Sequence, residues 1–145
     1  MEISQRAQNM PQSPIRKLAK YADAAKRNGI HVYHLNIGQP DILTPPCAME
    51  AVRSFDQSIL GYSPSQGTKS LRTKMVSYYA EYGIDLSPDE IIITSGGSEA
   101  IMFAYMACLN PGDEIIVTDP SYANYMAFAI SAGAIVKSVK THIES

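Results

Sequence analysis

The second half of the chain alternates short apolar segments with helical ones, and this order limits the fold more than any other feature. Three segments have the length and β-branched content of buried strands: residues 91–94, 114–118 and about 134–139. Two apolar segments of helical length separate them. Residues 98–109 are apolar all round, so this helix is expected to be buried on several sides. The second segment follows Pro120 and ends at Ala132. This alternation, with short connections, predicts an α/β fold in which helices cover a parallel sheet. Ligands of such sheets bind at the carboxyl ends of the strands.

The first half is mostly helical, and a domain boundary is expected near residues 44–50. A helix is predicted to start at Ser13–Pro14 and to end at Gly29, after an arm formed by residues 1–12. Residues 31–37 favour a short strand. Two more helices are predicted, with inward-facing apolar residues at Met49, Val52 and Phe55 in the first and at Leu71, Met75, Tyr78, Tyr79 and Tyr82 in the second.

Composition and residue spacing argue against several classes of function. With 12 basic and 14 acidic residues the net charge is -2, which argues against a nucleic-acid partner. Cys47 and Cys108 form no CxxC pair, and the three histidines have no metal-ligand spacing, so neither a metal site nor a disulfide framework is expected. The longest apolar run has 10 residues against about 20 for a membrane span. We therefore expect a soluble, cytoplasmic protein without a membrane partner.

The first candidate site is the turn Ser95-Gly96-Gly97-Ser98-Glu99 between a predicted strand and a predicted helix. Glycines allow a ligand to approach the backbone, and the free N–H groups of a helix start attract an anion. The turn has neither the dinucleotide-binding glycine pattern nor the lysine of a P-loop. An ordinary glycine turn with a serine cap explains it equally, and Glu99 opposes a phosphate unless its carboxylate points away.

Three further segments are candidates. Tyr122 follows the predicted strand 114–118, where its ring can lie against a planar ligand or pack on the next helix. Gly38, in Asn-Ile-Gly-Gln-Pro-Asp, indicates either backbone exposed to a cleft or a plain turn. Tyr62, in the loop of residues 61–67, is either a hydrogen-bonding phenol or an anchor of the loop.

Four segments, in this order, resemble the N-terminal portion of the class I/II aminotransferases, which are fold-type I enzymes that use pyridoxal 5'-phosphate. They are NIGQPD, GYSPSQGTKSLR, ITSGGSEAI and NPGDEIIVTDPSYANY, and the resemblance extends from about residue 14 onward. It implies that residues 1–46 form an N-terminal arm and part of the small domain. Residues 47–145 then form the first part of the large, cofactor-binding domain.

The resemblance also implies a role for each candidate residue. Gly97, Ser98 and Glu99 match the turn that holds the cofactor phosphate, and Tyr122 matches the aromatic residue that stacks on the pyridine ring. Tyr62 matches a tyrosine that crosses a homodimer interface to the partner's cofactor phosphate. Gly38 matches the glycine beside the substrate carboxylate. The implied substrates are an amino acid and a 2-oxo acid.

The chain also departs from the family pattern. Members of the family are longer, and their Schiff-base lysine lies downstream of these segments; none of the seven lysines present is at the matching position. We therefore expect an apparently truncated aminotransferase that has no catalytic residue within residues 1–145 and is inactive alone. Two alternatives remain open: another fold-type I enzyme such as a carbon–sulfur lyase, or a short non-enzymatic protein for binding or dimerisation.

Overall fold

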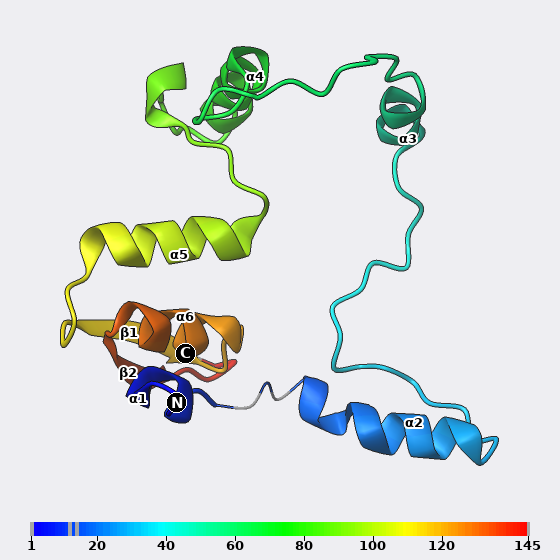
Figure 1. The fold of residues 1–145 in the computed structure, drawn as a ribbon, viewed down its shortest axis with the longest axis vertical. Coiled ribbons are helices and arrows are strands. Elements are labelled where there is room, and N and C mark those ends of the chain that lie inside the picture. The colour runs from blue at the N-terminus through cyan, green and yellow to red at the C-terminus, as the bar shows by residue number, and fades with distance from the viewer. Residues whose placement is uncertain (1, 12, 14, 145) are drawn as a thin grey trace. The chain divides into compact units, whose positions relative to one another are not determined.

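The computed structural model describes residues 2–11, 13 and 15–144 (Figure 1). The chain divides into two compact units, one formed by Met1–Ile37 with Ser95–Ser145 and the other by Gly38–Thr94. The first unit contains α1 (Gln5–Gln8), the 3-10 turn η1 (Arg16–Leu18), α2 (Ala19–Arg27), α5 (Gly97–Cys108), β1 (Glu114–Asp119), α6 (Asn124–Ala132) and β2 (Ile135–Lys140). The second contains α3 (Pro46–Arg53), α4 (Lys69–Ala80) and the 3-10 turn η2 (Pro88–Glu90).

The first unit holds a two-stranded parallel sheet. β1 pairs with β2 from Glu114 opposite Ile135 to Asp119 opposite Lys140, and α6 forms the crossover between them. The buried side chains come from all parts of this βαβ unit: Val117 in β1, Ala129 in α6 and Ala134 just before β2. The predicted strand–helix–strand order over residues 114–139 is therefore confirmed, as is the parallel α/β fold.

Local signals placed the ends of several helices correctly. Gly133 ends α6 in the left-handed conformation with φ +83°, and Gly29 follows α2 with φ +74°. The Ser13 hydroxyl accepts from the Arg16 amide at 3.4 Å, at the start of the predicted first helix; Pro14 lies outside the described residues. In the predicted arm, Ser4 caps α1, and Arg6 donates to the Ser131 carbonyl at the end of α6 at 3.3 Å.

Two predicted strands are absent from the described residues. In the segment 91–94, Ile91 is buried, but the Ile93 amide donates to the Gln66 carbonyl of a loop at 2.9 Å, so this bond joins no neighbouring strand. In residues 31–37 the Leu35 amide bonds locally to the Tyr33 carbonyl, and Leu35 is exposed. An apolar segment becomes a strand only where a second strand accepts its ladder of hydrogen bonds.

The expected burial of helix 98–109 and of the α3 side chains is wrong for this chain. α5 has no buried residue, and Phe103 and Met106 are 51% and 67% exposed. The helix packs against α6, and an apolar circumference needs contacts on more than one side to be buried. Met49 and Val52 in α3 and Phe55 just after it, which were expected to face inward, are all exposed.

Candidate functional site

The turn at residues 95–99 forms the start of α5. Gly96 precedes the helix with φ +149°, a conformation that L side chains rarely adopt, and it has no side chain to cap the helix. A Cβ built on Gly96 or Gly97 meets no atom within 4 Å. Helix geometry gives the first amides no intrahelical acceptor and places the positive end of the helix dipole here. The amides of the first turn therefore face a space that an anion can enter.

The Glu99 carboxylate is turned back toward the chain that precedes the helix. Its Oε2 atom accepts from the Ser95 amide at 2.7 Å. A glutamate at this helix position that bonds to an amide before the helix stabilises the helix start. The Glu99 side chain therefore holds the turn in shape, and contact with an anion is left to the backbone and to the exposed Ser98 hydroxyl.

Tyr122 lies just after the carboxyl end of β1 and is held through both its hydroxyl and its ring. Its oxygen accepts from Asn124 Nδ2 at 2.7 Å, and its ring meets the Tyr125 ring edge to face, with centroids 5.5 Å apart. The residue remains 47% exposed. Tyr122 thus offers a partly exposed aromatic surface in a fixed orientation.

Close to Tyr122, helix α6 packs against helix α5. Burial raises the pKa of the Tyr105 hydroxyl on α5, and the neighbouring Tyr125 phenol on α6 raises it further. Because the two helices pack together, the α5 turn and Tyr122 belong to one packed unit. Of the predicted site residues, the first unit therefore holds Gly97, Ser98, Glu99 and Tyr122.

Tyr62 and Gly38 belong to the second unit. The Tyr62 side chain is fully exposed, and a Cβ at Gly38 meets no atom within 4 Å. Both positions are therefore accessible to a ligand or to another chain.

Sequence reasoning missed Arg72 of α4, the buried charged side chain among the described residues. Its guanidinium donates to the carbonyls of Gly67 and Pro88 and to the carboxylate of Asp89. The helical period was available as a signal, because Arg72 shares one face with the half-buried Met75, Val76 and Tyr79. The inward face predicted for this helix began one residue earlier, at Leu71, and included Tyr78 and Tyr82. Leu71, Tyr78 and Tyr82 are all exposed.

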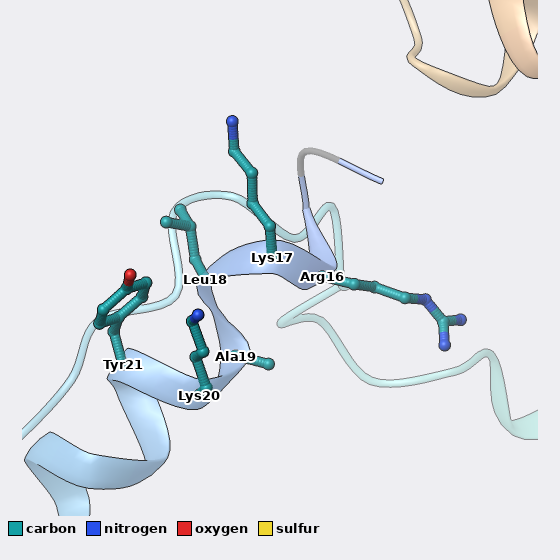
Figure 2. A pocket seen from close by; sticks show the side chains of 6 residues that line it. All are labelled: Arg16, Lys17, Leu18, Ala19, Lys20 and Tyr21. Atoms are coloured by element: carbon teal, nitrogen blue, oxygen red, sulfur yellow. The ribbon is translucent and has the colours of Figure 1, made fainter. Parts of the chain in front are cut away.

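A hollow beside η1 is lined by Arg16, Lys17, Leu18, Ala19, Lys20 and Tyr21. Figure 2 shows the Arg16 and Lys17 side chains pointing away from each other, and the Lys20 ammonium lies 5.0 Å from the centre of the Tyr21 ring. The cationic groups therefore do not converge on a common point. In the part of the chain that the structure describes, no group of three or more His, Cys, Asp or Glu side chains is arranged to hold a metal ion. No helix in that part is long and apolar enough to cross a membrane.

Comparison with known proteins identifies the family of this chain. Residues 30–144 match the family described as "Aminotransferase class I and II". The chain belongs to this family. It is 36% identical over 141 residues to the aspartate aminotransferase of Thermotoga maritima, and this alignment covers 96% of the chain and 37% of that protein. It is 33% identical to the aspartate/prephenate aminotransferase of Thermus thermophilus, over 96% of the chain and 37% of that protein.

Solved structures of aminotransferases confirm the fold. The crystal structure of the Thermotoga maritima aspartate aminotransferase matches 98% of the chain and 38% of its own length, with a TM-score of 0.87 at 35% identity. An alanine aminotransferase from Pyrococcus furiosus matches 99% of the chain and 37% of its own length, with a TM-score of 0.90 at 31% identity. The chain thus has the fold of the N-terminal portion of a fold-type I aminotransferase, and it spans about 37% of the length of the curated relatives it matches.

Proposed function

We propose that these residues belong to a cytoplasmic, pyridoxal-phosphate-dependent aminotransferase, which moves an amino group between an amino acid and a 2-oxo acid. The observation that carries the proposal is the open start of α5, where Gly96 and Gly97 leave the first-turn amides accessible within a chain of this family. The relatives named above act as aspartate, aspartate/prephenate or alanine aminotransferases. A small amino acid or dicarboxylic amino acid is therefore the first donor to test.

The residues present have the chemistry that the cofactor requires. A phosphate dianion needs several donors and a favourable potential, and the amides of Gly97 and Ser98, the Ser98 hydroxyl and the helix dipole supply them. A planar pyridine ring needs an apolar face, and the half-exposed Tyr122 ring supplies one. Asn124 and Tyr125 hold that ring in place.

When bound, the cofactor supplies an electron sink that makes the proton beside the amino group removable. The residues of this chain bind and orient: α5 fixes the phosphate, Tyr122 fixes the plane of the ring, and Gly38 leaves room for the substrate carboxylate beside its backbone. The family resemblance assigns proton transfer to a Schiff-base lysine downstream of residue 145. We therefore expect residues 1–145 alone to show no transaminase activity, and conversion of an amino acid and 2-oxoglutarate by this purified chain would refute that expectation.

The reaction type is tested on the complete polypeptide that carries these residues. With aspartate or alanine and 2-oxoglutarate, a transaminase forms glutamate and the matching 2-oxo acid in equal amounts. A carbon–sulfur lyase instead releases ammonia and a thiol from a sulfur-containing substrate. A short binding or dimerisation protein does neither and takes up no cofactor. Mass-spectrometric product analysis with ¹⁵N-labelled donor separates the three outcomes.

We also propose that the enzyme is a homodimer in which Tyr62 serves the partner's site. The full exposure of the Tyr62 side chain leaves its phenol available to another chain. In a symmetric dimer the contact is isologous, so each subunit's Tyr62 reaches the opposite cofactor phosphate. Residues 1–46 would then supply the arm and part of the small domain, and residues 47–145 the first part of the large domain.

A mixed dimer tests the shared site. One subunit carries Tyr62→Phe, the other lacks the catalytic lysine, and cofactor affinity is measured at the single site that keeps its lysine. If Tyr62 acts across the interface, that site receives its tyrosine from the lysine-less partner and binds normally. If the site instead shows the whole defect of the Tyr62→Phe homodimer, the tyrosine acts within its own subunit and the shared-site assignment is wrong.

A further inference from the structure

We propose that Arg72 is a positioning residue for cofactor binding, because it holds the loop that presents Tyr62. The inference rests on the proposed function, in which Tyr62 contacts the cofactor phosphate. It extends the site to a residue that touches neither cofactor nor substrate. All of the contacts involved lie within the second unit, residues 38–94.

The Arg72 guanidinium joins two segments that are distant in sequence. Its Nε atom donates to the Gly67 carbonyl at 3.3 Å, at the end of the Tyr62 loop. One terminal nitrogen donates to the Pro88 carbonyl and also lies 3.3 Å from Asp89 Oδ1, in η2. The Arg72 side chain is 11% exposed, whereas that of Asp89 is 95% exposed. Arg72 therefore acts as a buried connection between the loop and η2.

The end of the Tyr62 loop is fixed by further contacts around Gly67. The Gly67 amide donates to the Pro64 carbonyl at 2.8 Å, which closes a tight turn only two residues after Tyr62. The Gln66 carbonyl accepts from the Ile93 amide at 2.9 Å. Gly67 has φ +92°, and a Cβ there would lie 2.5 Å from Ile93 Cγ1. Arg72 and Ile93 thus both contact this end of the loop and hold it in place.

Burial makes the Arg72 contacts specific. A buried cation is costly unless it is paired, and among the described residues no buried side-chain nitrogen or oxygen lacks a partner. The planar fork of arginine can donate to three acceptors in fixed directions, which the single ammonium of lysine cannot reproduce. Replacing Arg72 by lysine therefore keeps the charge and loses the fork, so the loop gains freedom.

That freedom matters because Tyr62 itself is fully exposed and has no packing to hold it. A loop that is ordered before binding loses less entropy when it closes on a ligand. If Arg72 acts in this way, its contribution to cofactor affinity must pass through the Tyr62 hydroxyl. A residue that only stabilises the second unit would contribute equally with or without that hydroxyl. This difference separates positioning from general stability.

The test is a double-mutant cycle in the complete holoenzyme, with Tyr62→Phe, Arg72→Lys and the double variant. The readout is the dissociation constant of pyridoxal phosphate, measured by titration of the apoenzyme, together with urea unfolding of each variant. Loss of a hydrogen bond to a charged group predicts that Tyr62→Phe weakens affinity about tenfold or more. We expect Arg72→Lys to weaken affinity about fivefold in the wild type and less than about twofold in the Tyr62→Phe background. Arg53→Lys, the same substitution at an exposed site on α3, should leave affinity unchanged.

The results of this cycle distinguish a failure of the Arg72 role from a failure of the proposed role of Tyr62. An equal loss from Arg72→Lys in both backgrounds, or no loss in either, overturns the positioning role alone. If Tyr62→Phe binds the cofactor normally, the assignment of Tyr62 fails and the role of Arg72 fails with it. If Arg72→Lys does not fold, Ile93→Ala replaces it in the cycle, because this variant loosens the same loop end without leaving a buried charge. Equal losses from Ile93→Ala in both backgrounds would likewise overturn the proposal.

Discussion

The start of α5 and the junction around Arg72 each fix groups that are proposed to bind a cofactor phosphate, the subunit's own phosphate at the α5 start and the partner's in the case of Tyr62. At the α5 start, all of the fixing groups lie within residues 95–99, and the Glu99–Ser95 bond spans only four positions. At the Arg72 junction, the bonds join residue 72 to residues 67, 88 and 89, and residue 66 to residue 93. A helix start forms an anion site by local geometry, whereas an exposed loop needs contacts from distant parts of the chain.

Gly97 and Gly67 differ in what surrounds them. Gly97, at the α5 start, has open space where a side chain would be, so the packing of the described chain does not itself require a glycine there. Gly67, at the junction, has the Ile93 side chain where its Cβ would be. The first glycine is thus required by the proposed ligand, and the second by the fold. Substitution should therefore damage different properties at the two positions.

The largest effect is expected from Gly67→Ala. The substitution places an L residue at φ +92°, which costs about 1–3 kcal/mol, and pushes its Cβ onto Ile93, which costs about 1–3 kcal/mol more. Urea unfolding of the complete protein should show this loss. Gly61→Ala is the matched control, since a Cβ there meets nothing within 4 Å and its φ is not positive, so no loss is expected. Equal stability of the two variants would contradict the packing described for Gly67.

Gly97→Val should leave stability nearly unchanged and weaken cofactor binding. The open space around Gly97 accepts the side chain, so we expect the free energy of unfolding to change by less than about 1 kcal/mol. Cofactor affinity should fall about a hundredfold or more, because the branched side chain keeps the phosphate away from the first-turn amides. Ala104→Val, at an exposed position two turns along the same helix, should bind the cofactor normally. Normal affinity of the Gly97→Val enzyme would remove the proposed site.

A smaller loss is expected from Tyr122→Ala. Ring stacking contributes about 0.5–1.5 kcal/mol beyond area burial, so cofactor affinity should fall by about two- to tenfold from this contribution alone. Tyr122→Phe keeps the ring and removes only the bond from Asn124, so it should retain most of the affinity. Apoenzyme titration with pyridoxal phosphate measures both. A Phe variant as weak as the Ala variant would show that the hydroxyl, and not the stacked ring, makes the contribution.

The same local–distant contrast explains which sequence predictions succeeded. The helix that starts at the glycine turn, the glycine end of α6 and the pairing order of β1 and β2 follow from neighbouring residues and from a chain order that allows few topologies. The strand expected at residues 91–94 was wrong because pairing depends on what lies beside it, here the carbonyl of Gln66. The burial expected for α5 was wrong because the described chain packs α6 against one part of its apolar circumference.

In the candidate site, too, some features could be predicted from neighbouring residues and others could not. The open glycines and the bond of Glu99 could be expected from the turn sequence, although only the structure shows which way the carboxylate points. The residues that hold Tyr122, namely Asn124 and Tyr125, are two and three positions away and were not singled out. Arg72 was missed because a charged residue is normally assigned to the exposed face of a helix. Arg72 lies on the same face of α4 as the half-buried Met75 and Tyr79, so the helical periodicity was a better guide to its burial than its charge.

The smallest effect concerns pH and the η2 turn that supplies two of the Arg72 acceptors. The Ser87 amide donates to Glu90 Oε2 at 2.7 Å, and the Ser87 hydroxyl does so at 2.9 Å. The amide bond first, and then the hydroxyl bond, hold the pKa of the Glu90 carboxyl below its ordinary value of 4.5. A carboxyl whose pKa is lowered by folding stabilises the protein above its unfolded pKa, and this contribution is lost as the pH falls through the folded pKa.

Glu90→Gln should therefore be less stable than the wild type at pH 6–7, and the difference should narrow once the pH falls below about 4.5. Urea unfolding of the complete protein between pH 3 and 7 measures that difference. Ser87→Ala keeps the backbone donor and loses the hydroxyl, so its pH dependence should lie between those of the wild type and Glu90→Gln. Because Glu90 is exposed, the whole effect should be smaller than that of Gly67→Ala, which acts on the other end of the same junction. A difference between wild type and Glu90→Gln that stays constant down to pH 3 would show that the bonds to Ser87 do not favour the ionised carboxylate.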